Sequence, residues 1–72
     1  MRARTGAGVA LRRRASKEVP GEGWDELVVP FGDTESLAQE IAGYGAAVVA
    51  LDPPDLRDAV VRRLRAVLGE PA

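Results

Sequence analysis

The side chains in this sequence that are best suited to acid–base chemistry are carboxylates, because the chain contains neither histidine nor cysteine. The absence of histidine removes the usual general base, the Ser-His triad and the commonest zinc ligand, and the absence of cysteine removes disulfides and thiolate metal sites. The carboxylates that suggest a paired site lie in two predicted helices: Glu35, Glu40, Asp55 and Asp58. All four occupy cap or helix-surface positions, and no nucleophile is paired with a base. The sequence therefore predicts a protein that is not an enzyme and that has no catalytic residue, cofactor or metal ion.

The basic residues are segregated along the chain, although the net charge is only −1. Residues 1–17 carry six basic side chains and no acid, whereas residues 18–58 carry ten acids and one base. Such asymmetry allows a local contact with a polyanion. The strongest candidates for contact with nucleic acid or an effector are Arg12, Arg13 and Arg14, because phosphate affinity comes mainly from summed positive charge. The alternative is a solvated edge strand, whose charges discourage unwanted pairing.

Two further features have both a functional and a structural interpretation. Trp24 could stack on a nucleic-acid base, but without interleaved aromatic residues it is expected at the edge of the core or as a lid on a hairpin. The basic residues of the last predicted helix, Arg62, Arg63 and Arg65, are expected to complement the helix dipole and to face solvent rather than to bind phosphate.

The N-terminal half of the chain predicts a lead-in followed by a hairpin. Residues 1–8 are polar, contain glycine and show no periodicity, which is typical of a flexible lead-in. Residues 9–15 alternate at period two, which indicates a strand or the end of something larger. Residues 18–24 contain a proline and two glycines and predict a hairpin loop, after which residues 25–31 alternate as a strand that ends near Pro30.

The C-terminal half predicts a helix, a strand and a second helix. Asp33 is a favourable N-cap for a helix over 34–43, with Leu37, Ile41 and Tyr44 on its apolar face and with Gly43 and Gly45 as its left-handed stop. Residues 46–51 form a short apolar run between helix breakers, which suits a covered strand. Pro54 is favourable at the first position of a helix over 54–68. The predicted buried stripe of that helix comprises Leu56, Val60, Leu64, Val67 and Leu68, and Gly69 and Pro71 end it.

These elements follow one another in the order β-β-α-β-α. We therefore predict an α/β (α+β) fold in which a small sheet is covered on one face by the two helices. No apolar run approaches the roughly 20 residues that a membrane span requires, and this indicates a cytoplasmic protein.

The segment FGDTESLAQEIAGYGAAVVALDPPDLRDAVVRRL (31–64) resembles the C-terminal extension, called WCX, of WYL-domain transcriptional regulators, especially the actinobacterial PafC-like group. In that family a strand ends in a polar turn, a helix then finishes in GYG or SFG, and a short strand is followed by a proline and a Leu-Arg pair. The matching residues here are Asp33, Leu37, Gly45, Ala47, Val49, Leu51, Pro54, Leu56, Arg57 and Val60. The resemblance extends, more loosely, over residues 9–68.

The resemblance implies a transcription regulator in which a winged helix-turn-helix and a WYL domain precede a ferredoxin-like βαββαβ WCX domain. In that family the WYL and WCX parts sense an effector, in several members a nucleic acid, and assist dimerisation. This sequence has no helix-turn-helix and no WYL barrel, and is expected to lack the first strand and helix of WCX. We therefore expect a truncated domain over residues 9–69, between a lead-in over 1–8 and a tail over 70–72.

A truncated domain of this kind would have a gap in its sheet. The first strand of a ferredoxin-like sheet lies between the strands expected here at 25–31 and 46–51. We expect these two strands to pair directly, since a right-handed crossover through 34–43 allows it. The alternatives are a strand recruited from another copy and a partly molten chain.

The predicted function is the non-catalytic regulatory and oligomerisation region of such a regulator, in a fragment without the DNA-binding and WYL domains. Its expected partners are those domains or a second copy, with DNA contacted only through the absent domain and no membrane partner. The alternatives are a free-standing interaction protein with an open sheet edge and a weak, non-specific nucleic-acid binder.

Overall fold

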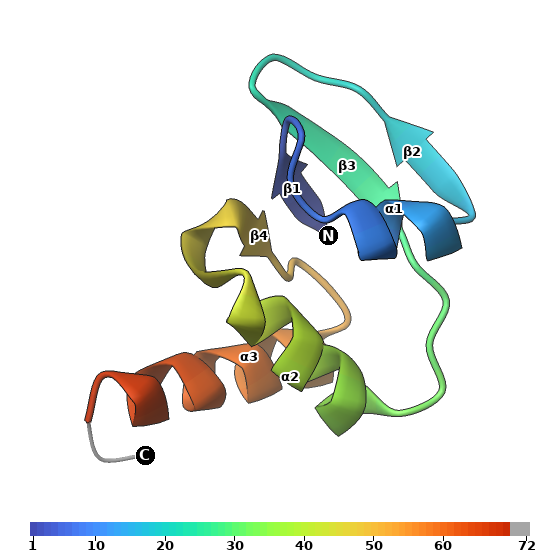
Figure 1. The fold of residues 1–72 in the computed structure, drawn as a ribbon. Coiled ribbons are helices and arrows are strands. Elements are labelled where there is room, and N and C mark those ends of the chain that lie inside the picture. Colours follow the sequence, from blue (N-terminus) through green and yellow to red (C-terminus); the bar gives the residue numbers. More distant parts are fainter. Residues whose placement is uncertain (70–72) are drawn as a thin grey trace.

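The computed structural model describes residues 1–69, so the tail expected at 70–72 lies outside the described residues. Its elements, in chain order, are β1 (Arg2–Arg4), α1 (Val9–Arg14), β2 (Lys17–Val19), β3 (Trp24–Val28), α2 (Thr34–Gly43), a 3₁₀ turn η1 (Gly45–Ala47), β4 (Val48–Val49) and α3 (Pro54–Val67). The sheet order is β2-β3-β1-β4, and all neighbouring strands are antiparallel (Figure 1). Together with the βαββαβ order, this is the ferredoxin-like arrangement implied by the resemblance, and the predicted mixed α/β class is confirmed.

The prediction that the first strand and helix are missing is wrong, because both elements are present. Residues 2–4 form β1, which lies between β3 and β4 and pairs with each of them. The Met1 amino group donates to the Leu27 carbonyl (2.7 Å), and the Leu27 N–H donates to the Met1 carbonyl (2.8 Å). The expected direct pairing of 25–31 with 46–51 is therefore wrong too, since β1 fills the gap between them.

Residues 9–14, for which the pattern suggested a strand, form the helix α1. Only Leu11 is fully buried in it, whereas Val9 is 56% exposed. One buried position in six residues gives no helical periodicity, and the chance alternation of Val9 and Leu11 with smaller or charged neighbours imitates a strand. The chain enters α1 through Gly8, whose φ of +72° lies in the left-handed region that glycine tolerates.

The prediction of a hairpin before residues 25–31 is confirmed in part, since β2 and β3 pair across residues 20–23. The loop is shorter than the predicted 18–24, because Lys17–Val19 form the first strand of the hairpin. A Cβ atom at Gly21 would lie 2.5 Å from the Trp24 carbonyl oxygen, so this loop requires glycine there. In the segment after the loop, Leu27 and Val29 are buried as expected, whereas Phe31 is 39% exposed. Pro30 lies beyond β3, as its missing amide donor requires.

The segment after β3 follows the predicted order with a shorter strand. Asp33 caps α2 as expected, and its side chain accepts the Glu35 N–H (3.2 Å). Gly45 has φ +61°, whereas Gly43 is the last residue of α2 and has no positive φ. Residues 46–51 were predicted to be extended throughout, but Gly45–Ala47 form a 3₁₀ turn and only Val48–Val49 pair as β4.

Helix α3 begins at Pro54, as predicted. Leu56 and Val60 are buried and Leu64 packs against the core, but Val67 and Leu68 are 82% and 74% exposed. The predicted buried stripe is therefore wrong in its last turn. The helix extends past the part of the molecule that it covers, so its final residues have no core beside them (Figure 1).

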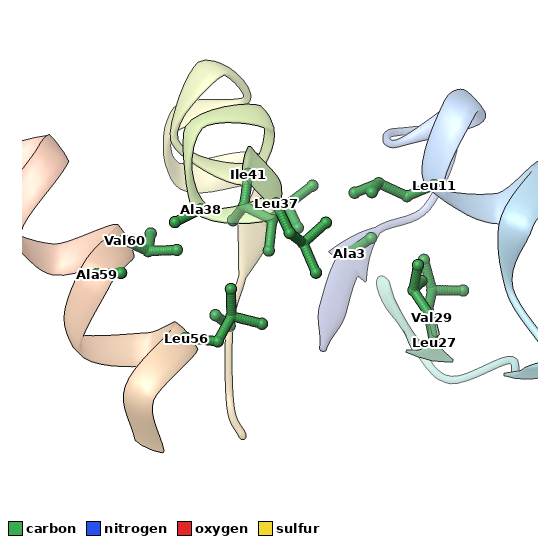
Figure 2. Close-up of a cluster of buried hydrophobic side chains, with 12 residues drawn as sticks. Ala3, Leu11, Leu27, Val29, Leu37, Ala38, Ile41, Leu56, Ala59 and Val60 are labelled. Carbon is green, nitrogen blue, oxygen red and sulfur yellow. The ribbon is translucent and has the colours of Figure 1, made fainter. Parts of the chain in front are cut away.

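The core lies on one face of the sheet. Figure 2 shows side chains from α2 and α3 pointing toward those of β1, α1 and the β3 segment. Ala3, Leu27 and Val48 contribute from the strands, and Leu11, Ile41 and Leu56 are among the helical contributions. The prediction of two helices on one face is confirmed for α2 and α3, and α1 adds a third element to that layer.

We expect Leu11→Ala to lower the free energy of unfolding by about 2–5 kcal/mol, because it deletes a fully buried side chain from the core. Val9→Ala, on the exposed side of the same helix, is the matched control and should cost less than about 0.5 kcal/mol. The measurement is urea denaturation followed by circular dichroism. Equal effects of the two variants would show that α1 does not pack against the sheet.

Candidate functional site

Arg12 is an internal clamp rather than a free surface charge. Its guanidinium contacts the Asp25 carboxylate (2.8 Å) and the Glu18 carboxylate (2.9 Å), and only 17% of its side chain is exposed. The same side chain donates to the carbonyl oxygens of Ala7 (2.7 Å) and Arg4 (3.0 Å). Arg12 therefore joins α1 to β1, to the turn after β1 and to both strands of the β2–β3 hairpin.

Asp25 is the acidic partner of this clamp and is the one buried charged side chain in residues 1–69. The hydrogen bond from Arg12 holds the pKa of the Asp25 carboxyl below its ordinary value, and the Gly21 N–H (3.2 Å) acts in the same direction. Partial burial opposes this shift without reversing it. The hydrogen bond that Arg12 donates to Asp25 in turn raises the pKa of Arg12. Both groups are therefore held in their charged forms by each other.

The other two members of the predicted arginine cluster lie in different surroundings. Arg14 forms an ion pair with Glu40 and so links α1 to α2. Arg13 is exposed, and within residues 1–69 it forms no ion pair. The three arginines therefore do not present one common basic face, and of the three only Arg13 is free to meet a ligand without breaking an internal contact.

The carboxylates that suggested a paired site are mostly held by arginines. Glu35 pairs with Arg62 and Arg63 (3.3 Å each), which ties α2 to α3, and Glu40 pairs with Arg14. Asp58 pairs with Arg57 (3.5 Å). In residues 1–69 no group of three potential metal-ligating residues occurs. The basic residues of α3 were expected to face solvent, and two of them also bridge the helices.

The structural motif residues have clear local roles. The Asp33 side chain accepts hydrogen bonds from the Ser36 hydroxyl and the Glu35 N–H, and these lower the pKa of its carboxyl, with the Ser36 contact the larger cause. Gly45 provides the left-handed residue before β4, Pro54 begins α3, and Leu56 is fully buried. Arg57 is exposed. These residues shape the fold and do not meet at one site.

The face of the sheet that carries no helix in residues 1–69 is a mixed surface. Register places Val19, Glu26, Arg2 and Val49 in one row across β2, β3, β1 and β4. Beside this row the Arg4 guanidinium lies 5.1 Å from the centre of the half-buried Trp24 ring, within the range of a cation–π contact. In the sequence, the sign of this surface is that Arg2 and Arg4 flank Ala3. Because the strand has only three residues, this alternation is too short to be recognised as a strand pattern.

A second surface feature is an apolar groove of about 410 Å³ between β4 and α3. One wall is formed by residues 45–46 and 48–51, and the other by Arg57, Val61 and Leu64 of α3, with the buried Val60 between them. Val49, Leu51 and Val61 are each about 40% exposed. We refer to this feature as the β4–α3 groove. Sequence reasoning missed it because Val61 lies outside the predicted buried stripe.

We expect Asp25→Asn to reduce the loss of stability in acid. Because the pKa of Asp25 is lowered on folding, its contribution is complete above the ordinary value of about 3.9 and is lost as the pH falls through the lower folded value. The measurement is Tm between about pH 7 and pH 2. The variant should be less stable than the parent at neutral pH, and its Tm should fall less below about pH 4.

The control for this experiment is Glu26→Gln, an exposed neighbour on the opposite face of β3. Some acid sensitivity should remain in Asp25→Asn, because the Asp33 carboxyl also has a lowered pKa. Identical pH profiles for the parent and Asp25→Asn would contradict the clamp.

Comparison with known proteins places these features in a family. The family model of the WCX domain matches residues 1–68.

The Protein PafB of Mycobacterium tuberculosis (strain H37Rv) and that of Mycobacterium bovis are each 38% identical over 68 residues, which is 89% of this chain and 20% of each relative. That of Mycobacterium leprae is 38% identical over 60 residues, 83% of this chain and 18% of the relative. The chain thus spans about a fifth of the length of these relatives. No solved structure matches it significantly. The match over residues 1–68, with the ferredoxin-like order of strands, shows that this chain belongs to the WCX domain family.

Proposed function

We propose that this chain is the non-catalytic regulatory and oligomerisation region of a WYL-domain transcriptional regulator. The observation that carries the proposal is the WCX match, which covers all of the described elements. Within residues 1–69, the strongest charged cluster, around Arg12, is used to hold the fold together. A regulatory module acts through its surfaces, and the surfaces left available here are the open sheet face and the β4–α3 groove.

The proposal includes the partners and the location of the protein. The partners are the WYL and helix-turn-helix parts of a regulator or a second copy of the chain, and duplex DNA is contacted through those other domains. None of the helices in residues 1–69 is both long and apolar enough to cross a membrane. We propose a cytoplasmic location, as a transcription regulator requires, and we propose that the chain corresponds to a fragment of a longer regulator. The β1 strand supports a domain that includes residues 2–4 as well as residues 9–69.

The graft experiment replaces the WCX region of a WYL-domain regulator with this chain. We expect the chimera to keep effector-dependent transcription from its promoter, because the graft restores the whole β1–α3 unit. The destabilised Leu11→Ala graft should lose it, and the Val9→Ala graft should retain it. A chimera that folds and binds its operator but no longer responds to effector would contradict the proposed function.

A second candidate function is weak, non-specific nucleic-acid binding by the free chain. The observation in its favour is the stack of Arg4 on Trp24, with Arg2 and Lys17 on the same sheet face. Basic residues beside an aromatic ring suit single strands, whose bases stack on the ring while the cations meet phosphate. This function is compatible with the first, because it concerns a different surface from the β4–α3 groove.

The isolated chain should bind duplex DNA weakly and without sequence preference, with a Kd of about 10⁻⁴–10⁻⁶ M at physiological salt, because residues 1–69 present no recognition helix. Fluorescence anisotropy over a salt series measures this. Arg13→Glu and Arg2→Glu each remove a cation that makes no ion pair within residues 1–69, and the variant that removes a true contact should flatten the salt slope by about one. Sequence-specific binding at physiological salt would overturn the prediction.

A further inference from the structure

The outer edge of β4 has backbone groups available for pairing. Met1 exchanges both of its backbone hydrogen bonds with Leu27 of the β3 side. Because backbone groups in an antiparallel sheet alternate in direction, the groups of Arg2 point to β4 and meet those of Val49. It follows that the N–H and C=O groups of Val48 and Ala50 point away from β1. Within residues 1–69 no other strand pairs with β4 on that side.

The two edges of the sheet differ in composition. The β2 edge carries Lys17 and Glu18 and is followed by Pro20, and charge and proline are the usual features that prevent edge pairing. The β4 edge is apolar from Ala46 to Leu51 and lies beside the apolar β4–α3 groove. The fold therefore blocks one edge and leaves the other ready to accept a strand.

We propose that the occupant of this edge is a second copy of the chain, with β4 pairing antiparallel to its mate about a two-fold axis at Val49. In that register Val48 of each copy exchanges hydrogen bonds with Ala50 of the other, so the same two residues supply all the donors and acceptors. The two four-stranded sheets then become one continuous sheet. This identifies the surface behind the proposed role in oligomerisation, and rests on that role.

The charges of α3 support a second copy over a different partner. The groove side of α3 carries Val61 and Leu64 as an apolar stripe. Asp58 and Arg65 lie outside the groove lining, two turns apart along the exposed side of α3 next to Val61. Asp58 contacts Arg57 (3.5 Å), but both of these side chains are more than half exposed. When two α3 helices meet antiparallel with the two-fold midway between these residues, Asp58 of each copy faces Arg65 of the other. The antiparallel helix dipoles are also favourable in this arrangement. The groove lining is apolar apart from Arg57, so it offers no set of complementary charges to a highly charged peptide.

Sedimentation equilibrium of the whole chain from roughly 10 µM to 1 mM, the range in which small interfaces associate, tests this proposal. We expect a monomer–dimer equilibrium and no larger species, because a two-fold interface closes on itself. Val61→Glu, at an exposed position in the groove, should weaken dimerisation at least tenfold. Val28→Glu, on the open sheet face and 55% exposed, is the matched control and should leave the equilibrium unchanged.

A charge exchange tests the register and separates it from any effect on folding. Asp58→Arg and Arg65→Asp should each weaken dimerisation several-fold, and the double variant should restore it. Amide exchange at Val48 and Ala50 should slow as the concentration rises. Three outcomes would each overturn the proposal. The first is a chain that stays monomeric at all concentrations, and the second is association that is lost in Val28→Glu but not in Val61→Glu. The third is a double variant that dimerises no better than the two single variants. A monomeric chain whose graft still supports regulation would overturn this interface alone, and a dimer whose graft fails would overturn the proposed function alone.

Discussion

The backbone hydrogen bonds of β1 are the interaction on which the rest of the structure depends. β3 and β4 do not pair with each other, because β1 lies between them and pairs with both. Only three residues form this strand, and its one inward side chain, Ala3, is fully buried at the centre of the core. An alanine leaves room there for Leu11 and Val48 to approach one another from α1 and β4. Loss of β1 would therefore remove the connection between the hairpin and the β4–α3 half.

The Arg12 clamp stabilises β1 and α1, which are both short. A strand of three residues leads within a few residues into a helix of six, and both are too short to be stable in isolation, since isolated helices need about 12–15 residues. Arg12 fixes both at once by donating to the Arg4 and Ala7 carbonyls while it pairs with Asp25. The ion pair and hydrogen bonds of the clamp provide stability that this short segment cannot gain by burying apolar surface. This explains why a charged residue is so little exposed in a chain with a small core.

The sequence predicted the C-terminal part of the fold better than the N-terminal part, for physical reasons. The Asp33 cap, the Leu37–Ile41 face of α2 and Pro54 at the start of α3 are strong local signals, and the structure confirms each. β1 and α1 depend on contacts with residues far away in the chain, such as Leu27 and Asp25, and no local pattern reports them. The family resemblance is correct, but the sequence predicts an incomplete fold because β1 and α1, with three and six residues, are too short to leave a recognisable pattern.

The candidate surfaces also depend on contacts between residues far apart in the chain, which local sequence patterns do not report. The run of three arginines suggested one basic patch, yet helical geometry turns successive side chains by about 100°, which sends Arg12 toward the hairpin, Arg14 toward α2 and leaves Arg13 exposed. A triplet in a strand would also have divided, with its members alternating between two faces. The β4–α3 groove, in contrast, is formed by segments that are each apolar in the sequence, and only their placement side by side makes the surface. In this small domain charge mainly holds the fold together, and the apolar edge is the surface left for a partner.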